Sequence, residues 1–162
     1  LLVYYAVLFG GQAVIVDPKG ERGGWKENLP EIADEINILN LTSKPENQGL
    51  LDPYVIMKKK KDSESLAIDI LTFLTGISSR DGEKFPVLRK AIRTVTQSDQ
   101  RGLLQVINEL RKENSPVAEN IADHIESFTD YDFAHLLFSD GSITQSISLD
   151  KQLNIIQVAD LV

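Results

Sequence analysis

The chain has 162 residues, of which 42% are hydrophobic and 25% charged, an ordinary composition for one globular domain with room for a small appendage. Acidic residues outnumber basic ones by 24 to 17, and the resulting net charge of −7 argues against a general nucleic-acid binder. The absence of cysteine excludes a disulfide framework and a thiolate metal site, and it agrees with a cytoplasmic location.

The first twenty residues predict a helix followed by a strand. An unbroken apolar run, Leu1–Phe9, ends at two glycines, which is typical of a helix with a C-terminal glycine stop. The next apolar segment, Ala13–Val16, is rich in β-branched residues and predicts a short buried strand that ends at Asp17. Pro18 and Gly20 then turn the chain.

Charged side chains follow this strand directly. In open α/β sheets, ligands gather at the carboxyl ends of the strands, so Asp17, Lys19 and Glu21 form a candidate nucleotide site. A plain strand exit is an equally open interpretation. A third, a Walker B strand whose Asp17 would hold Mg²⁺, is disfavoured by Pro18. The sequence contains no G-x-x-x-x-G-K-[ST] loop, so these 162 residues are not a complete P-loop enzyme.

The middle of the chain alternates between loops and short elements. A helical turn at Glu31–Glu35 precedes a second predicted strand, Ile36–Leu41, and a loop follows from Thr42 to Pro53. The basic run Lys58–Lys61 favours a solvated loop ahead of a helix over a DNA contact.

From Asp62 onward the apolar spacing becomes that of amphipathic helices. The first helix has Asp62 or Ser63 as its expected N-cap and Gly76 as its stop, and a short fifth helix covers Tyr131–Phe138. Strand character returns at Asn154–Val158. The expected inner faces of the four longer helices are Leu66, Ile70, Phe73, Leu74 and Ile77; Leu88, Ala91, Ile92 and Val95; Leu103, Ile107 and Leu110; and, after the Ser115-Pro116 start, Val117, Ile121, Ile125 and Phe128.

Three short motifs link the chain to a known family. The turn Asp17–Glu21, D-P-K-G-E, is similar to a D-P-x-G-E element; Leu50–Tyr54 is similar to an L-(N/D)-P-(F/Y) element; and Leu149–Val158 is similar to the strand that resumes after a helical insertion. On these motifs the chain resembles the conjugative type IV secretion ATPases, the VirB-four-like traffic ATPases, and the related HerA/FtsK group.

The resemblance implies an α/β fold: a partial RecA-like P-loop NTPase core with an inserted, mainly helical subdomain. Residues 1–57 would belong to the core, 58–141 to the helical insertion, and 142–162 to the return strand of the core. The chain would then be a fragment lying between the Walker A loop and the Walker B strand of its parent.

The same resemblance implies roles for the candidate residues. Glu21 would orient a catalytic water, and Asp17 and Lys19 would lie near the nucleotide phosphates. The full-length parent would bind ATP and Mg²⁺, whereas we expect no cofactor, metal or activity for the fragment alone.

The parent would act as a homo-oligomer with other secretion-system subunits, associated through them with the cytoplasmic face of the bacterial inner or cell membrane. We expect DNA binding by the fragment no tighter than the non-specific range, roughly 10⁻⁴ to 10⁻⁶ M. Two alternatives stay open: a fragment of a coupling-protein or FtsK-type DNA pump, and a non-enzymatic helical protein-interaction module.

Overall fold

The computed structural model describes residues 2–42, 44–131, 134–142 and 147–159. The chain divides into two compact units. The sheet unit consists of Leu1–Ser43 with Ile147–Val162, and the helical unit is Lys44–Ser146. The functional assignment of 1–57, 58–141 and 142–162 as core, insertion and return strand stays a prediction.

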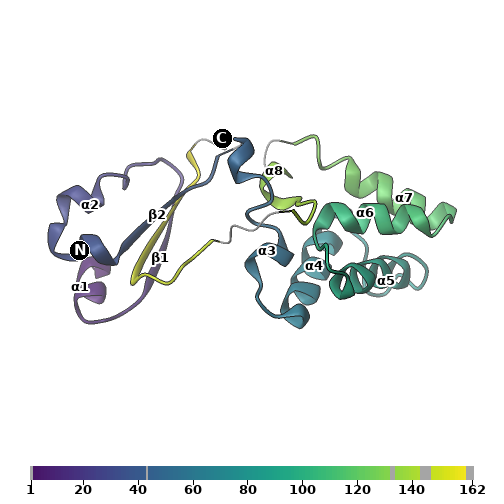
Figure 1. Ribbon diagram of the computed structural model, residues 1–162, viewed down its shortest axis with the longest axis horizontal. Coiled ribbons are helices and arrows are strands. Elements are labelled where there is room, and N and C mark those ends of the chain that lie inside the picture. The colour runs from purple at the N-terminus through teal and green to yellow at the C-terminus, as the bar shows by residue number, and fades with distance from the viewer. Residues whose placement is uncertain (1, 43, 132–133, 143–146, 160–162) are drawn as a thin grey trace. The chain divides into compact units, whose positions relative to one another are not determined.

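The sheet unit contains three parallel strands, which Figure 1 shows side by side. Its elements are α1 (Leu2–Leu8), β1 (Ala13–Asp17), α2 (Trp25–Asn28), the 3₁₀ helix η1 (Pro30–Glu35), β2 (Ile36–Asn40) and β3 (Leu153–Gln157). The strand order is β1-β3-β2, so the strand from the end of the sequence lies between the other two. The expected α/β class, with all three predicted strands in one sheet, is confirmed.

One face of this sheet carries the core of the unit. Alternate residues of the strands pack with side chains from α1, α2 and η1, and the fully buried members of this cluster are Val7, Ile32, Ile36, Leu153 and Ile155. On the opposite face, Val14 and Val16 are 52% and 61% exposed. Asn154 of β3 alternates with the core residues Leu153 and Ile155 and is fully buried, so the described residues cover this second face in part, whereas buried parallel strands usually have cover on both faces.

The helical unit follows the predicted order of helices. Its elements are the 3₁₀ helix η2 (Pro45–Asn47), α3 (Pro53–Ile56), α4 (Lys60–Thr75), α5 (Lys84–Gln97), α6 (Leu103–Lys112), α7 (Pro116–Glu126) and α8 (Ala134–Leu137). The inner faces expected for α5 and α6 are buried in one core. Ser115 caps α7 as predicted, since its Oγ accepts a hydrogen bond from the Ala118 amide at 3.1 Å. Residues 132–133 of the expected fifth helix lie outside the described residues.

The predictions for α4 need two corrections. The helix begins at Lys60 with Lys59 as N-cap, because Ser63 is buried and donates its hydroxyl to the Lys60 carbonyl at 2.9 Å instead of capping. The buried stripe is Ser63, Ala67, Leu71 and Thr75, one position beyond the predicted face, and Phe73 is 86% exposed. Apolar residues occur around most of this helix, so their spacing alone did not distinguish the buried face from the face beside it. The small side chains of Ser63 and Ala67 permit close packing, and the face that carries them is the one that is buried.

A buried carboxylate joins three parts of the helical unit. Asp52 is fully buried and accepts hydrogen bonds from the amides of Tyr54 at 2.9 Å, Leu103 at 2.7 Å and Ser139 at 2.9 Å. It therefore caps α3, satisfies the first amide of α6 and holds the segment that follows α8. First-turn amides have no partner within their own helix, so the carboxylate meets a general requirement of helix starts.

The residues around Asp52 fit this junction closely. The Tyr54 hydroxyl donates to the carbonyl of Ile92 on α5 at 3.2 Å, which anchors α3 in the core. A Cβ atom at Gly102 would lie 2.2 Å from the Ser139 carbonyl oxygen, so only glycine fits just before α6. The L-D-P-Y element of the sequence is thus the structural junction of the helical unit.

Replacing Asp52 by Ala should reduce the free energy of unfolding by roughly 3 kcal/mol or more, since each buried amide left without a partner costs about 1–3 kcal/mol. Denaturant unfolding followed by circular dichroism measures this. Asp99→Ala, at an exposed loop position, is the matched control and should change stability by less than about 0.5 kcal/mol. Equal effects of the two substitutions would contradict the assigned role.

The same carboxylate should also make stability depend on pH. Burial raises the pKa of Asp52 from 3.8 to about 6, against the opposing effect of the hydrogen bonds from Leu103, Ser139 and Tyr54. Between about pH 4 and 6 the folded chain thus keeps the Asp52 proton that the unfolded chain has released. The free energy of unfolding should therefore fall as the pH rises through this range. Asp52→Asn should remove the effect. An Asp52 carboxyl NMR titration with its midpoint near the ordinary value would contradict the expectation.

Candidate functional site

Polar side chains end all three strands of the sheet unit. In the parallel register, Asp17 of β1 pairs with Gln157 of β3, and Asn40 of β2 pairs with the same Gln157. The three residues therefore form one row along the carboxyl edge, where ligands of open α/β sheets bind. The row includes one predicted site residue, Asp17.

Asp17 is fully buried, and its carboxylate is hydrogen-bonded by the turn that follows it. Its carboxylate accepts hydrogen bonds from the Arg22 amide at 2.8 Å and from the Arg22 guanidinium at 3.1 Å. Burial raises the pKa of the Asp17 carboxyl, but hydrogen bonds from the Arg22 amide, the Gln157 side chain and the Lys19 amide outweigh this, so the pKa lies below its usual range. The ionised carboxylate thus fixes the shape of the D-P-K-G-E turn.

The turn is also tied to the central strand. Gln157 Nε2 donates to the Gly20 carbonyl at 3.3 Å, while the same side chain bonds Asp17. Gly20 has a φ of +69°, a left-handed conformation that glycine adopts readily. The position of the turn is therefore set by β1 and β3 together.

A pocket of ≈ 310 Å³ opens beside this turn. The pocket is lined by Lys19 and Gly20 of the turn, by Asn40 and Leu41 at the end of β2, and by Gln157 and Ala159 at the end of β3. Lys19 is exposed, so its ammonium group is available to an anion at the carboxyl edge.

The three predicted site residues thus lie in one turn but in different environments. Asp17 is buried, whereas Lys19 and Glu21 are exposed, and Glu21 is not among the residues that line the pocket. The assignments of Glu21 to catalysis and of Asp17 and Lys19 to the phosphates stay predictions.

Sequence reasoning missed Arg22, Gln157 and Asn40. Arg22 pairs with Asp17 and places its guanidinium 5.7 Å from the ring centroid of Trp25, which packs on the core of the sheet unit. The position of Arg22, a cation directly after the D-P-K-G-E turn, was the sequence feature that could have indicated its role as a partner of Asp17. Gln157 and Asn40 become recognisable only when the strand order is known.

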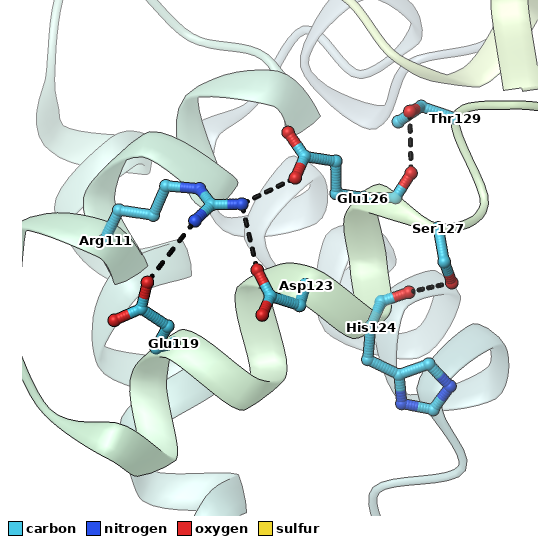
Figure 2. Close-up of polar contacts among 7 residues, drawn as sticks. All are labelled: Arg111, Glu119, Asp123, His124, Glu126, Ser127 and Thr129. Carbon is cyan, nitrogen blue, oxygen red and sulfur yellow. Dashed lines mark hydrogen bonds and ion pairs between the residues drawn. The ribbon is translucent and has the colours of Figure 1, made fainter.

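The helical unit has a second group of charged side chains, drawn in Figure 2. Arg111 of α6 contacts three carboxylates of α7: Glu119 at 3.7 Å, Asp123 at 3.0 Å and Glu126 at 2.5 Å. All four side chains are at least 37% exposed, so these ion pairs add little stability and serve to orient α6 against α7. His124 of α7 stacks on Phe128, which follows the helix, with ring centroids 5.6 Å apart.

Within the part of the chain that the structure describes, no group of three or more His, Asp or Glu side chains is arranged to hold a metal ion. No helix there combines the length and the apolar character needed to cross a membrane.

All 162 residues match the family described as AAA-like domain, and the chain belongs to that family. Its fold is similar to that of VirB4 of Thermoanaerobacter pseudethanolicus, with a TM-score of 0.64 and 14% sequence identity. The similarity covers 99% of this chain and 46% of the VirB4 chain, so the chain spans less than half the length of that protein. Among curated proteins, none matches the sequence.

Replacing Asp17 by Ala should speed hydrogen exchange of the Arg22 amide by about tenfold or more, because that amide loses its acceptor and local opening becomes easier. Amide exchange followed by NMR measures the change. Glu21→Ala, an exposed carboxylate of the same turn, is the matched control and should leave the rate unchanged. Unaltered exchange in the Asp17 variant would show that the carboxylate does not hold the turn.

Proposed function

We propose that this chain is part of an ATPase that energises conjugative DNA transfer or type IV secretion. The observation that carries the proposal is the family match over the entire chain. The similarity of the fold to VirB4 over nearly all of these residues supports the secretion context.

The geometry of the sheet unit is consistent with a nucleotide-binding core. Its strands are parallel, and the row of Asp17, Gln157 and Asn40 lies at the edge where such cores bind ligands. In the proposed site, Lys19 offers its ammonium to a phosphate at the neighbouring pocket. Asp17 holds the turn in place, and Glu21 orients the attacking water.

The remaining parts of the catalytic site would come from a longer protein. A phosphate-binding loop of the form G-x-x-x-x-G-K-[ST] is absent from these 162 residues, and the chain spans only 46% of the VirB4 chain. ATP and Mg²⁺ would therefore bind in the full-length protein, which we propose to act as a homo-oligomer with other secretion subunits at the cytoplasmic face of the membrane.

The isolated 162-residue chain should show no ATP hydrolysis above background, whereas the longer protein should hydrolyse ATP. In the longer protein, Glu21→Gln should lower kcat by about a hundredfold, the lower end of the effect of removing a general base. Lys19→Ala should raise KM, because it removes a charge that binds the phosphates. A coupled phosphate-release assay measures both.

Lys26→Ala supplies the matched control, since Lys26 is an exposed lysine of α2 that does not line the pocket. The proposal would be wrong if the gene encoded no phosphate-binding loop outside these residues, or if the longer protein had no ATPase activity. Micromolar binding of ATP and Mg²⁺ to the isolated chain, measured by calorimetry, would require a different site assignment.

A further inference from the structure

An apolar pocket of ≈ 380 Å³ opens on the sheet unit where α1 and α2 lie next to each other (Figure 1). Its lining is apolar except for one amide side chain, and consists of Tyr4, Trp25, Asn28 and Leu29. Tyr4, Trp25 and Leu29 are half-buried, so a part of each is open to an occupant. The pocket shares no lining residue with the one at the carboxyl edge, and its volume is within the range of sites that bind large side chains or small ligands.

The two aromatic walls of this pocket are held in place. The Tyr4 hydroxyl donates a hydrogen bond to the Glu31 carboxylate of η1 at 2.5 Å. The Arg22 guanidinium lies 5.7 Å from the ring centroid of Trp25 and is itself anchored by the Asp17 carboxylate at 3.1 Å. Both rings also pack on the core of the sheet unit. Because these walls are ordered before binding, filling the pocket costs less conformational entropy than covering a mobile surface.

The apolar surface continues beyond the pocket along α1. The Tyr5 ring packs edge-on against Tyr4 with centroids 5.6 Å apart, and Tyr5 is 49% exposed. Leu2 lies three residues before Tyr5 on the same helix, hence on the same face, and is 88% exposed. Exposed apolar surface next to a pocket marks protein contact sites. The pocket and its surroundings therefore suit a polypeptide segment better than a small molecule.

The charge around the pocket is negative. Residues 21–35 contain five acidic and two basic side chains, and the first of the two basic ones is already paired, so Lys26 is the one cation that offsets them. Glu27 and Glu31 are exposed, and neither forms an ion pair among the residues that the structure describes. The hydrogen bond from the neutral Tyr4 holds the pKa of the Glu31 carboxyl below its usual value, so Glu31 stays ionised and uncompensated at neutral pH.

We propose that this pocket, which we call the Trp25 pocket, binds a basic segment of a partner protein. A phenylalanine or leucine of the segment would occupy the pocket, and lysine or arginine side chains on either side of it would pair with Glu27 and Glu31. The aromatic walls would supply most of the affinity, as buried aromatic contacts do in other interfaces. The carboxylates would speed association with basic partners and exclude partners of the wrong charge.

The same carboxylates disfavour the other classes of occupant. A nucleic acid, an acidic segment and a second copy of this chain, with its net charge of −7, would all bring negative charge to Glu27 and Glu31. The charge of a basic segment is opposite both to the rim of the pocket and to the chain as a whole.

The test uses the 162-residue chain and a short synthetic peptide with a central phenylalanine, two lysines on each side of it and no tryptophan. Trp25 is the only tryptophan of the chain, so its fluorescence reports on the pocket directly. Titration should give a saturable shift of the emission to shorter wavelength, because the peptide excludes water from the ring. The affinity should fall as salt is added. Peptides with serine in place of the phenylalanine, or with glutamates in place of the lysines, should not bind.

Variants separate the aromatic wall from the charged rim. Tyr4→Ser should weaken binding about tenfold or more, as expected for the loss of an aromatic contact, whereas Tyr4→Phe keeps the ring and should restore most of the affinity. Combining Glu27→Gln with Glu31→Gln keeps an acceptor for the Tyr4 hydroxyl but removes both charges, and should also weaken binding about tenfold and reduce its salt dependence. Asp69→Asn with Asp99→Asn makes the same charge change at exposed positions of the helical unit and should leave the affinity unchanged.

The rim variant alters only exposed side chains, so it decides the test if Tyr4→Ser does not fold. The proposal is wrong if the lysine peptide does not bind, or if it binds the wild type and the rim variant equally. Saturation of the Trp25 shift by the glutamate peptide or by a single-stranded oligothymidylate would assign the pocket to an acidic ligand. Binding to the 162-residue chain but not to the longer protein would show that residues of that protein itself fill the pocket.

Discussion

The helical unit depends on the hydrogen bonds that converge on the Asp52 carboxylate. Three segments far apart in sequence each direct a backbone amide at it, from Tyr54, Leu103 and Ser139. An apolar core can bring helices together in several registers that differ little in energy. A buried carboxylate with three amide partners penalises every register in which one amide is left unpaired, so it selects a single arrangement of α3, α6 and the segment after α8.

Local signals in the sequence were sufficient for much of this fold. The glycine stop at Gly76 and the Ser115-Pro116 start were both correct, because capping is set by neighbouring residues alone. Strand positions were also predictable, since short runs of β-branched residues have few alternatives. The inner face of α4 was not predictable, because apolar residues such as Leu66 and Ile70 flank the true stripe and only the packing partners choose among them.

The candidate site was predictable only in part, for a related reason. The D-P-K-G-E turn could be recognised from adjacent residues and from its place after a strand. The burial of Asp17 by Arg22 and Gln157 depends on the pairing of β1 with β3, whose residues are far apart along the chain. The buried role of Asp52 was missed similarly, because two of its three partners lie in distant segments.

The position of β3 in the middle of the sheet has a consequence for synthesis on the ribosome. Among the residues that the structure describes, β1 and β2 do not pair with each other, and each pairs with β3, which follows both of them in the sequence. The helical unit, built from consecutive segments, is complete before β3 leaves the exit tunnel. The hydrogen bonds that β3 makes with β1 and β2 can therefore form only after the helices between them have been made, and long-range strand pairing of this kind is slow and exposes the chain to aggregation.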